Sequence, residues 1–442
     1  MENPFFHRGP IRNTDYFFDR CVELAQASEL LRNGQSVSVV GPRRIGKTSF
    51  LFRLVRELQS AGEAVSPAQI AVYVDCSSLR LSSETDLYAT LLDELREQLH
   101  AQCASDELDI PCPDAPISYR AFEQVIRNLT RQQRRVIFFL DEFATLSENP
   151  YLTVDVFLGL RALAMRYGVI YVTASTQPLL ELTYAQASRL SSPFFNFFAQ
   201  IRLGLFEPNE AEHLMQTLNS QVGIAFDTDA SMRVMELSGP HPLMLQIAGY
   251  HAIEQLERTH QPPLECIDRI RARFLDDVTP HWTYFWNNLC VGDQRLLALL
   301  PVSWRGDPDG VQRLEQAGLI IRGKEGVIPV SPEFQRFVAR QSVPGLHQAM
   351  PVTIDPSQHL ALLRGRPLSF SPTEFNLLDC LVERAGQIIP HDILETQVWG
   401  DTNGDPERLK TTLRALRQAL GKDAACIENE RGIGYRFMRA VC

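Results

Sequence analysis

The sequence lacks long apolar runs and low-complexity tracts, although it is 442 residues long. Its apolar runs fall far short of the roughly 18 or more residues of a membrane span, so we expect no membrane partner. The chain does not open with a basic region followed by an apolar stretch, which argues against an export signal. We therefore expect a cytoplasmic protein of roughly three domains, because single cores stop growing at about 250–300 residues.

The sequence also lacks any Cys-x-x-Cys pair, and its nine cysteines are scattered and odd in number. This pattern argues against a disulfide framework or a zinc site. The chain has no excess of positive charge either, because its formal net charge is −10. This charge argues against a general nucleic-acid coat, but it does not exclude a local DNA-reading face.

A complete phosphate-binding loop is present at residues 41–48, which read Gly-Pro-Arg-Arg-Ile-Gly-Lys-Thr. The loop follows the apolar run 37–40 and precedes a helix-like segment, an order typical of a nucleotide cradle. Lys47 is expected to reach the β and γ phosphates of ATP or ADP, and the Thr48 hydroxyl to ligate Mg²⁺. The residues expected to surround the phosphates are Gly41, Pro42, Arg43, Arg44, Ile45, Gly46, Lys47, Thr48 and Ser49.

A second motif, residues 134–142, is an apolar strand that ends in Asp141 and Glu142. Buried parallel strands present such carboxylates at the sheet edge where ligands bind. Asp141 is the expected Mg²⁺ partner, and Glu142 can polarise a water for attack on the γ phosphate. The expected catalytic groups are thus Lys47, Asp141 and Glu142, and we expect slow ATP hydrolysis that serves as a switch.

Alternating strands and helices predict an α/β fold with a doubly wound parallel sheet. The strand at 169–174 ends in polar residues, of which Thr176 is expected to sense the γ phosphate. Helical periodicity then dominates, and the turn at 238–242 places His241 and Pro242 at a helix N-terminus that can face an anion. From the residues alone, His241 is equally a phosphate contact or a capping histidine of a lid helix.

Two further segments have the element order of winged helices. In residues 265–343, three helices precede a short hairpin and a further helix, but the third helix balances Asp309 and Glu315 against Arg313. That balance argues against DNA reading and favours an internal regulatory module. A linker is expected at 344–351.

The C-terminal segment, residues 352–442, begins with short strands and continues with an N-cap signature at 371–374. Its third helix carries four basic residues and one acidic residue, and a leucine stripe faces the core. We therefore expect a recognition helix in the major groove of double-stranded DNA, with a hairpin wing at the phosphates. The expected DNA contacts are Arg408, Lys410, Thr411, Thr412, Arg414, Arg417 and Arg431.

These motifs resemble known families. Residues 3 to about 343 resemble the STAND group of AAA+-related signal-transduction ATPases in the Asn-Pro-Phe opening, Phe-Asp-Arg at 18–20, the phosphate loop, Leu-Asp-Glu at 140–142, Ser-Pro-Phe-Phe at 192–195 and Gly-Pro-His-Pro at 239–242. The resemblance implies that His241 and Pro242 contact the nucleotide. Residues 352–442 resemble the OmpR/PhoB-type winged-helix domain, notably in Val-Trp-Gly at 398–400 and Arg-Gly-Ile-Gly-Tyr-Arg-Phe at 431–437.

The organisation predicted is a nucleotide-binding domain at 1–205, a helical lid at 206–264, a winged helix at 265–343, the linker, and a DNA-binding domain at 352–442. We interpret the chain as a nucleotide-gated transcription regulator, and the resemblance implies a nucleotide-dependent homo-oligomer with a protein or ligand effector. Two alternatives stay open at this point: an ATPase motor or loader of a mobile element, and a nucleotide-stabilised protein adaptor. Basal turnover with and without DNA separates the switch from the motor.

Overall fold

The structure is a computed structural model that describes residues 3–5, 8–61, 68–101, 116–184, 196–221, 228–259, 263–323, 326–400 and 406–438. The Ser-Pro-Phe-Phe motif at 192–195 lies outside these residues. The chain divides into two compact units, the first comprising Met1–Met235 with Pro240–Ile270 and the second Glu236–Gly239 with Arg271–Cys442. Over the described residues, no helix is both long and apolar enough to cross a membrane.

The first unit contains a five-stranded parallel sheet in the order β2-β3-β4-β1-β5. The strands are β1 Ser36–Val40, β2 Ala68–Asp75, β3 Arg134–Asp141, β4 Ile170–Ser175 and β5 Phe198–Arg202. Because the strands are parallel, their carboxyl ends share one edge of the sheet, so the phosphate loop after β1 and the carboxylates after β3 lie at the same edge, on either side of β4. The predicted doubly wound α/β fold is confirmed.

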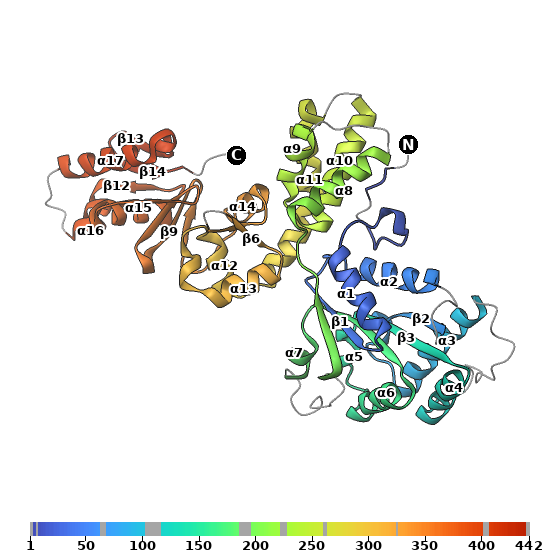
Figure 1. Ribbon diagram of the computed structural model, residues 1–442. Helices are drawn as coiled ribbons and strands as arrows, with labels where there is room; N and C mark the ends of the chain where they lie inside the picture. The colour runs from blue at the N-terminus through green and yellow to red at the C-terminus, as the bar shows by residue number, and fades with distance from the viewer. Residues whose placement is uncertain are drawn as a thin grey trace. The chain divides into compact units, whose positions relative to one another are not determined.

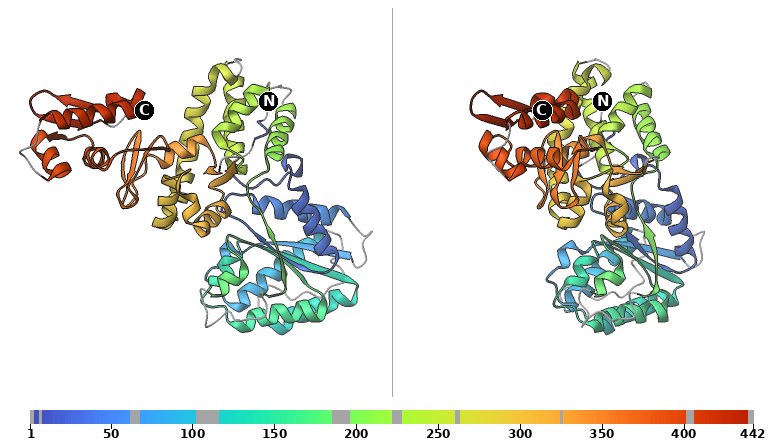
Figure 2. Two further views of the ribbon diagram at one scale, coloured as in Figure 1. Left: turned by 60° about the vertical axis from the view of Figure 1, so that its left-hand side comes forward. Right: turned by 90° about the vertical axis from the view of Figure 1, so that its left-hand side faces the viewer.

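Helices cover both faces of this sheet (Figures 1 and 2). One core contains apolar residues of α1 (Cys21–Arg32) and α2 (Lys47–Ala61). The other contains residues of α3 (Glu84–Ala101), α4 (Tyr119–Arg131), α5 (Ala144–Glu148), α6 (Val154–Tyr167) and α7 (Leu179–Tyr184). Successive strand residues point to opposite faces, so Phe138 belongs to one core and Phe139 to the other.

Three helices follow the sheet in the segment predicted to be a lid, and we call them the lid: α8 (Pro208–Gln221), α9 (Thr228–Ser238) and α10 (Pro242–Thr259), followed by the short η6 (Pro263–Cys266). The N-terminal segment packs against this lid. Asn3 Nδ2 donates to the Tyr250 carbonyl at 3.0 Å, and the buried Phe5 ring fills the space where a Cβ at Gly249 would stand. Only glycine therefore fits at this position of α10.

The middle winged helix lies in the second unit, apart from its residues up to Ile270, which belong to the first. It contains α11 (Ile267–Asn287), α12 (Val291–Ala298), η7 (Ser303–Gly306), α13 (Pro308–Gln316), the hairpin of β6 (Ile320–Gly323) and β7 (Gly326–Pro329), and α14 (Pro332–Val338). Trp282 lies between the rings of Phe274 and Phe334 and is fully buried. These aromatic contacts provide the core that joins α11 to α14.

The C-terminal domain opens with an antiparallel sheet in the order β11-β10-β9-β8. Its strands are β8 His347–Ala349, β9 Val352–Asp355, β10 Leu360–Leu363 and β11 Arg366–Leu368, with η8 at Pro356–Gln358. Residues 347–349 of the expected linker thus form an edge strand, because β8 pairs with β9 and Ala349 joins the domain core. The segment His347–Ala349 was too short to predict a strand.

Three helices and a second sheet complete this domain. They are α15 (Pro372–Glu383), α16 (His391–Trp399), α17 (Pro406–Leu420), η9 (Gly421–Cys426), β12 (Ile388–Pro390), β13 (Ile427–Glu430) and β14 (Gly434–Phe437). Ser371 and Glu374 form the capping box predicted for α15. Leu409, Leu413, Leu416 and Leu420 of α17 all lie in the core, which leaves the opposite, basic face outward.

Candidate nucleotide and DNA sites

The phosphate loop links β1 to α2, and its backbone geometry requires glycine. A Cβ at Gly41 would lie 2.6 Å from the Leu203 carbonyl oxygen, and Gly46 has a φ of +100°. The helix begins at Lys47, within the last two residues of the loop, so its first N–H groups face the space in front of the sheet. This is the arrangement that binds phosphate at a helix N-terminus.

The Lys47 ammonium folds back over this loop. Its Nζ donates to the carbonyl oxygens of Gly41 at 2.9 Å and Pro42 at 3.0 Å. Burial lowers the pKa of Lys47, while the carboxylates of Glu142 and Asp141 act in the opposite direction. The two acidic residues therefore help to keep a buried cation charged at the centre of the loop.

The expected Mg²⁺ ligands are adjacent. Thr48 Oγ1 donates to Asp141 Oδ2 at 2.7 Å, and the Glu142 backbone N–H donates to Asp141 Oδ1 at 2.9 Å. A hydroxyl and a carboxylate are the hard oxygen donors that Mg²⁺ takes from a protein when phosphates and water supply the rest. The chemistry of this pair thus fits a magnesium–nucleotide complex.

Tyr73 of β2 was missed by the sequence analysis. Its hydroxyl donates to the same Asp141 Oδ2 at 2.9 Å, and its ring lies 4.6 Å from that of Phe52 on α2. Burial and the neighbouring Asp141 raise the pKa of Tyr73, so the phenol stays protonated and remains a donor. The signal was available in the sequence, since Tyr73 lies two residues before the end of the strand that neighbours the carboxylate strand.

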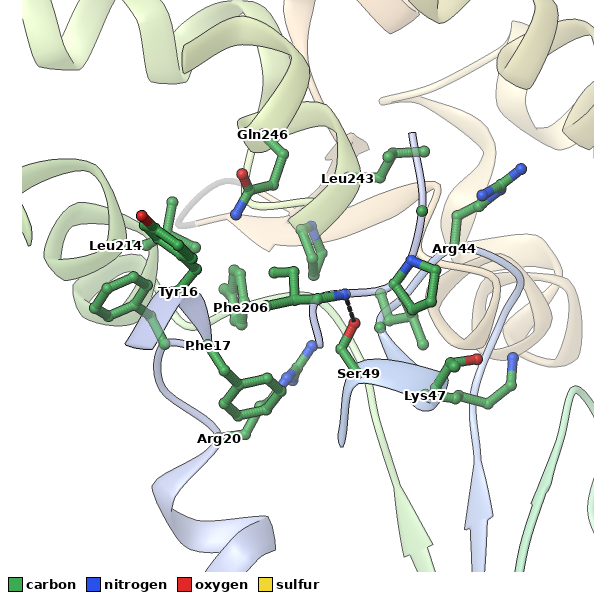
Figure 3. A pocket seen from close by; sticks show the side chains of 18 of the residues that line it. Tyr16, Phe17, Arg20, Arg44, Lys47, Ser49, Phe206, Leu214, Leu243 and Gln246 are labelled. Carbon is green, nitrogen blue, oxygen red and sulfur yellow. Dashed lines mark hydrogen bonds between the residues drawn. The ribbon is translucent and has the colours of Figure 1, made fainter. Parts of the chain in front are cut away.

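A cavity of about 340 Å³ lies in front of the phosphate loop. Three parts of the first unit enclose it, and Figure 3 shows their side chains converging on one space. The phosphate loop and Glu142 form one side, the N-terminal aromatic residues Tyr16, Phe17 and Phe18 form another, and the lid contributes Phe206, Leu214, Pro242, Leu243 and Gln246. Aromatic walls beside a cationic loop suit a ligand with a flat base and a phosphate chain.

The N-terminal segment is fixed to this site at two points. The Ile11 N–H donates to Ser49 Oγ at 2.9 Å, which ties the segment to α2. Arg20 is buried, its guanidinium donates to the Gly204 carbonyl and to Glu23, and it lies 4.5 Å from the centre of the Phe206 ring. Burial lowers the pKa of Arg20, against the attraction of Glu23 and Glu210. The Phe-Asp-Arg motif thus holds the aromatic wall against the lid.

The predicted residues fall into three groups. Arg43, Arg44, Ile45, Gly46, Lys47, Thr48, Ser49, Glu142 and Pro242 line the cavity. Gly41, Pro42 and Asp141 lie directly behind it as partners of Lys47 and Thr48. Thr176 is exposed after β4, and His241 is 2% exposed just before α10, neither being a lining residue of this cavity. Their contact with nucleotide stays a prediction.

The residues expected to contact DNA are in part exposed and in part bonded to neighbouring elements. Lys410, Thr411, Arg414 and Arg431 are exposed. Arg417 instead donates to the Ile427 carbonyl at 2.8 Å and lies over the Tyr435 ring, and Arg408 lies 4.8 Å from the Trp399 ring centre. Thr412 donates to the Arg408 carbonyl. Arg417 and Arg408 therefore connect α17 to the wing and to α16 respectively.

A phosphate-loop domain with a lid, followed by winged helices with a basic α17, defines a nucleoside-triphosphatase domain joined to a DNA-binding domain. The chain belongs to the family described as Novel STAND NTPase 2, whose model matches residues 33–300. Residues 365–437 match the family described as Transcriptional regulatory protein, C terminal. The predicted resemblance to both families is confirmed.

Similar proteins agree with this division. The transcriptional regulatory protein CrdR of Helicobacter pylori is 36% identical over 91 residues, which are 20% of this chain and 41% of that protein. QseB of Escherichia coli O157:H7, also a transcriptional regulatory protein, is 34% identical over 85 residues, or 19% of this chain and 38% of that one. The chain thus spans about two fifths of the length of these relatives. The Walker-type ATPase PABY2304 of Pyrococcus abyssi shares the fold, with a TM-score of 0.52 at 14% identity over 76% of this chain and 99% of that one.

Proposed function

We propose that this chain is a transcription regulator gated by ATP and ADP. The observation that supports this most is the cavity, because the phosphate loop, the N-terminal aromatic residues and the lid all line it. A ligand that contacts all three parts stabilises one arrangement of the lid over others, by as much as it binds that arrangement more tightly. Nucleotide identity is thereby converted into lid position.

Each polar group has a defined task in this proposal. Lys47 leaves the carbonyls of Gly41 and Pro42 to contact the β and γ phosphates, and the α2 N-terminus supplies further N–H donors. Thr48 and Asp141 hold Mg²⁺, which neutralises phosphate charge when bound. Glu142 lines the cavity and accepts a proton from the attacking water, so hydrolysis resets the switch.

The output of the switch is DNA binding by α17 and the wing. Lys410, Thr411 and Arg414 form its exposed polar face, and Arg431 extends from the wing hairpin. These residue types contact base edges and phosphates in winged-helix complexes. Nucleotide-dependent oligomerisation then brings two such faces to adjacent half-sites, which raises the apparent affinity without new contacts.

Lys47→Ala tests the proposal, with Lys422→Ala as a control that removes an exposed lysine outside the site. We expect Lys47→Ala to abolish binding of fluorescent ATP and ADP analogues and to give one mass by light scattering under all conditions. The parent and the control should give different masses with ATP and with ADP. If the parent has the same mass with ATP, with ADP and without nucleotide, gating is contradicted. In a separate assay, continuous ATP hydrolysis that DNA stimulates supports the ATPase motor instead.

A further inference from the structure

The middle winged helix pairs several of its charged groups with one another. Arg313 donates to Asp293 at 2.6 Å, Arg322 to Glu315 at 2.8 Å, and Arg271 to Glu333 at 2.7 Å. Arginines that are paired with carboxylates in this way are not arranged to bind DNA phosphates. This agrees with the sequence of α13, in which two acidic residues accompany one arginine. The module therefore needs another role.

Arg295 of α12 points instead to the C-terminal domain, where β9 lies beside α12 (Figure 1). Its Nη2 donates to both carboxylate oxygens of Asp355 at 2.6 Å and also contacts the Ser357 hydroxyl. Asp355 is 0% exposed and accepts in addition from the N–H groups of Ser357 and Gln358. A fully buried carboxylate is strongly unfavourable without a cationic partner, and here the partner comes from the other module.

Two glycines mark further close approaches, one to a backbone oxygen and both to side-chain atoms. At the β10–β11 turn, a Cβ on Gly365 would lie 3.1 Å from Gln335 Nε2 of α14 and 3.4 Å from the Leu300 carbonyl oxygen. A Cβ on Gly345 would lie 3.3 Å from Arg295 Nη1. The two modules are thus in contact at the Arg295–Asp355 ion pair and, separately, at the β10–β11 turn. Contacts at two separate places restrict the orientation of one module on the other as well as its position.

We propose that the middle winged helix is a docking platform for the DNA-reading domain, held in one orientation by the Arg295–Asp355 ion pair. The contact uses the N-terminal sheet of that domain, and Lys410, Arg414 and Arg431 stay exposed. Docking therefore directs the recognition helix without covering it. This inference is independent of nucleotide gating, since every contact in it lies within the second unit.

The test uses the full chain with Arg295→Met and, separately, Asp355→Asn. Asparagine keeps an acceptor oxygen for the Ser357 and Gln358 amides, so the second variant removes the charge but retains the local turn. Arg322→Met is the matched control, because it removes an ion-paired arginine of the same module whose partner, Glu315, lies in that module. Small-angle X-ray scattering and amide hydrogen exchange are measured without nucleotide or DNA.

Both test variants should increase the radius of gyration, and exchange should rise by about tenfold or more in α12 and at the β10–β11 turn. The control should match the parent in both measurements. Scattering and exchange that match the parent in both test variants would overturn the proposal, as would faster exchange confined to residues 355–358 with unchanged scattering. If the Arg295→Met protein loses its helical circular dichroism signal, it is unfolded, and the proposal is then tested by the Asp355→Asn protein alone.

Discussion

Tyr73→Phe should weaken the dependence of nucleotide binding on Mg²⁺ while leaving the cavity unchanged. The substitution removes one hydroxyl, which donates to Asp141 Oδ2 at 2.9 Å, and keeps the ring that packs on Phe52. Asp141 then loses one of the two hydroxyl donors to that oxygen, the other being Thr48. In the proposed complex Thr48 turns to the metal, so Tyr73 is the donor that continues to orient the carboxylate.

The magnitude follows from the class of interaction. Partners that orient a metal ligand typically contribute about 10–100-fold to metal affinity, and a single hydrogen bond to a charged acceptor contributes about 1.5–3 kcal/mol. We expect the Mg²⁺ concentration at half-saturation to rise about tenfold, or ~1.4 kcal/mol. The assay titrates Mg²⁺ at a fixed concentration of a fluorescent ATP analogue and repeats nucleotide binding in EDTA.

The control is Tyr167→Phe, since the Tyr167 hydroxyl also donates to a carboxylate, Glu123 Oε1, at 3.0 Å, on α4 away from the cavity. Nucleotide affinity in EDTA should be the same for parent, variant and control. Equal Mg²⁺ half-saturation in Tyr73→Phe and Tyr167→Phe would refute the assigned role of Tyr73. An equal loss of affinity in EDTA and in Mg²⁺ would refute it too, because the defect would then lie in the cavity.

Three further predictions concern hydrolysis, DNA binding and acid stability. Glu142→Gln should retain ATP and reduce its hydrolysis by about 10²-fold or more, as measured by phosphate release, because an amide cannot accept the proton; parental turnover would show that another group is the base. Arg414→Ala should weaken DNA binding and lower its salt dependence without changing the melting temperature, whereas Arg417→Ala should lower the melting temperature, since only Arg417 bonds to the wing; gel-shift and melting assays that rank the pair oppositely would contradict this. Burial opposes ionisation of Glu333, but bonds from arginines outweigh it and lower its pKa. Its contribution to the free energy of unfolding is therefore complete above an unfolded pKa of about 4.3 and is lost as the pH falls through the lower folded value. Denaturant unfolding of Glu333→Gln should thus depend less on pH than that of the parent between about pH 5 and pH 3; identical pH profiles would remove Glu333 from this account.

Sequence patterns predicted the sheet and the helices well where the period was long and the signals at the ends were strong. The strand at 134–141 could be recognised because it is apolar on both faces, and α15 because Ser371 and Glu374 form a capping box. The edge strand β8 could not be recognised in the same way, since His347–Ala349 is three residues long and gains its partner only when β9 pairs with it.

The candidate site was predictable where a motif carries the geometry. The phosphate loop, Asp141 and Glu142 are local sequence signals, and the structure brings them together. Tyr73 and Arg20 owe their positions to neighbours distant in sequence, Asp141 for the first and Gly204 for the second. For Arg417, charge and helical position alone could not distinguish a group that faces DNA from one that bonds to its own wing.

The contact of Asn3 and Phe5 with α10 has a consequence for biosynthesis. Asn3 and its partner Tyr250 are 247 residues apart in the chain. At a translation rate of roughly 5–20 residues per second, the ribosome takes on the order of 12–50 s to make the second partner after the first. Throughout that interval the Phe5 ring has no Gly249 to pack against, so Asn3 and Phe5 reach their native contacts only after α10 has been synthesised.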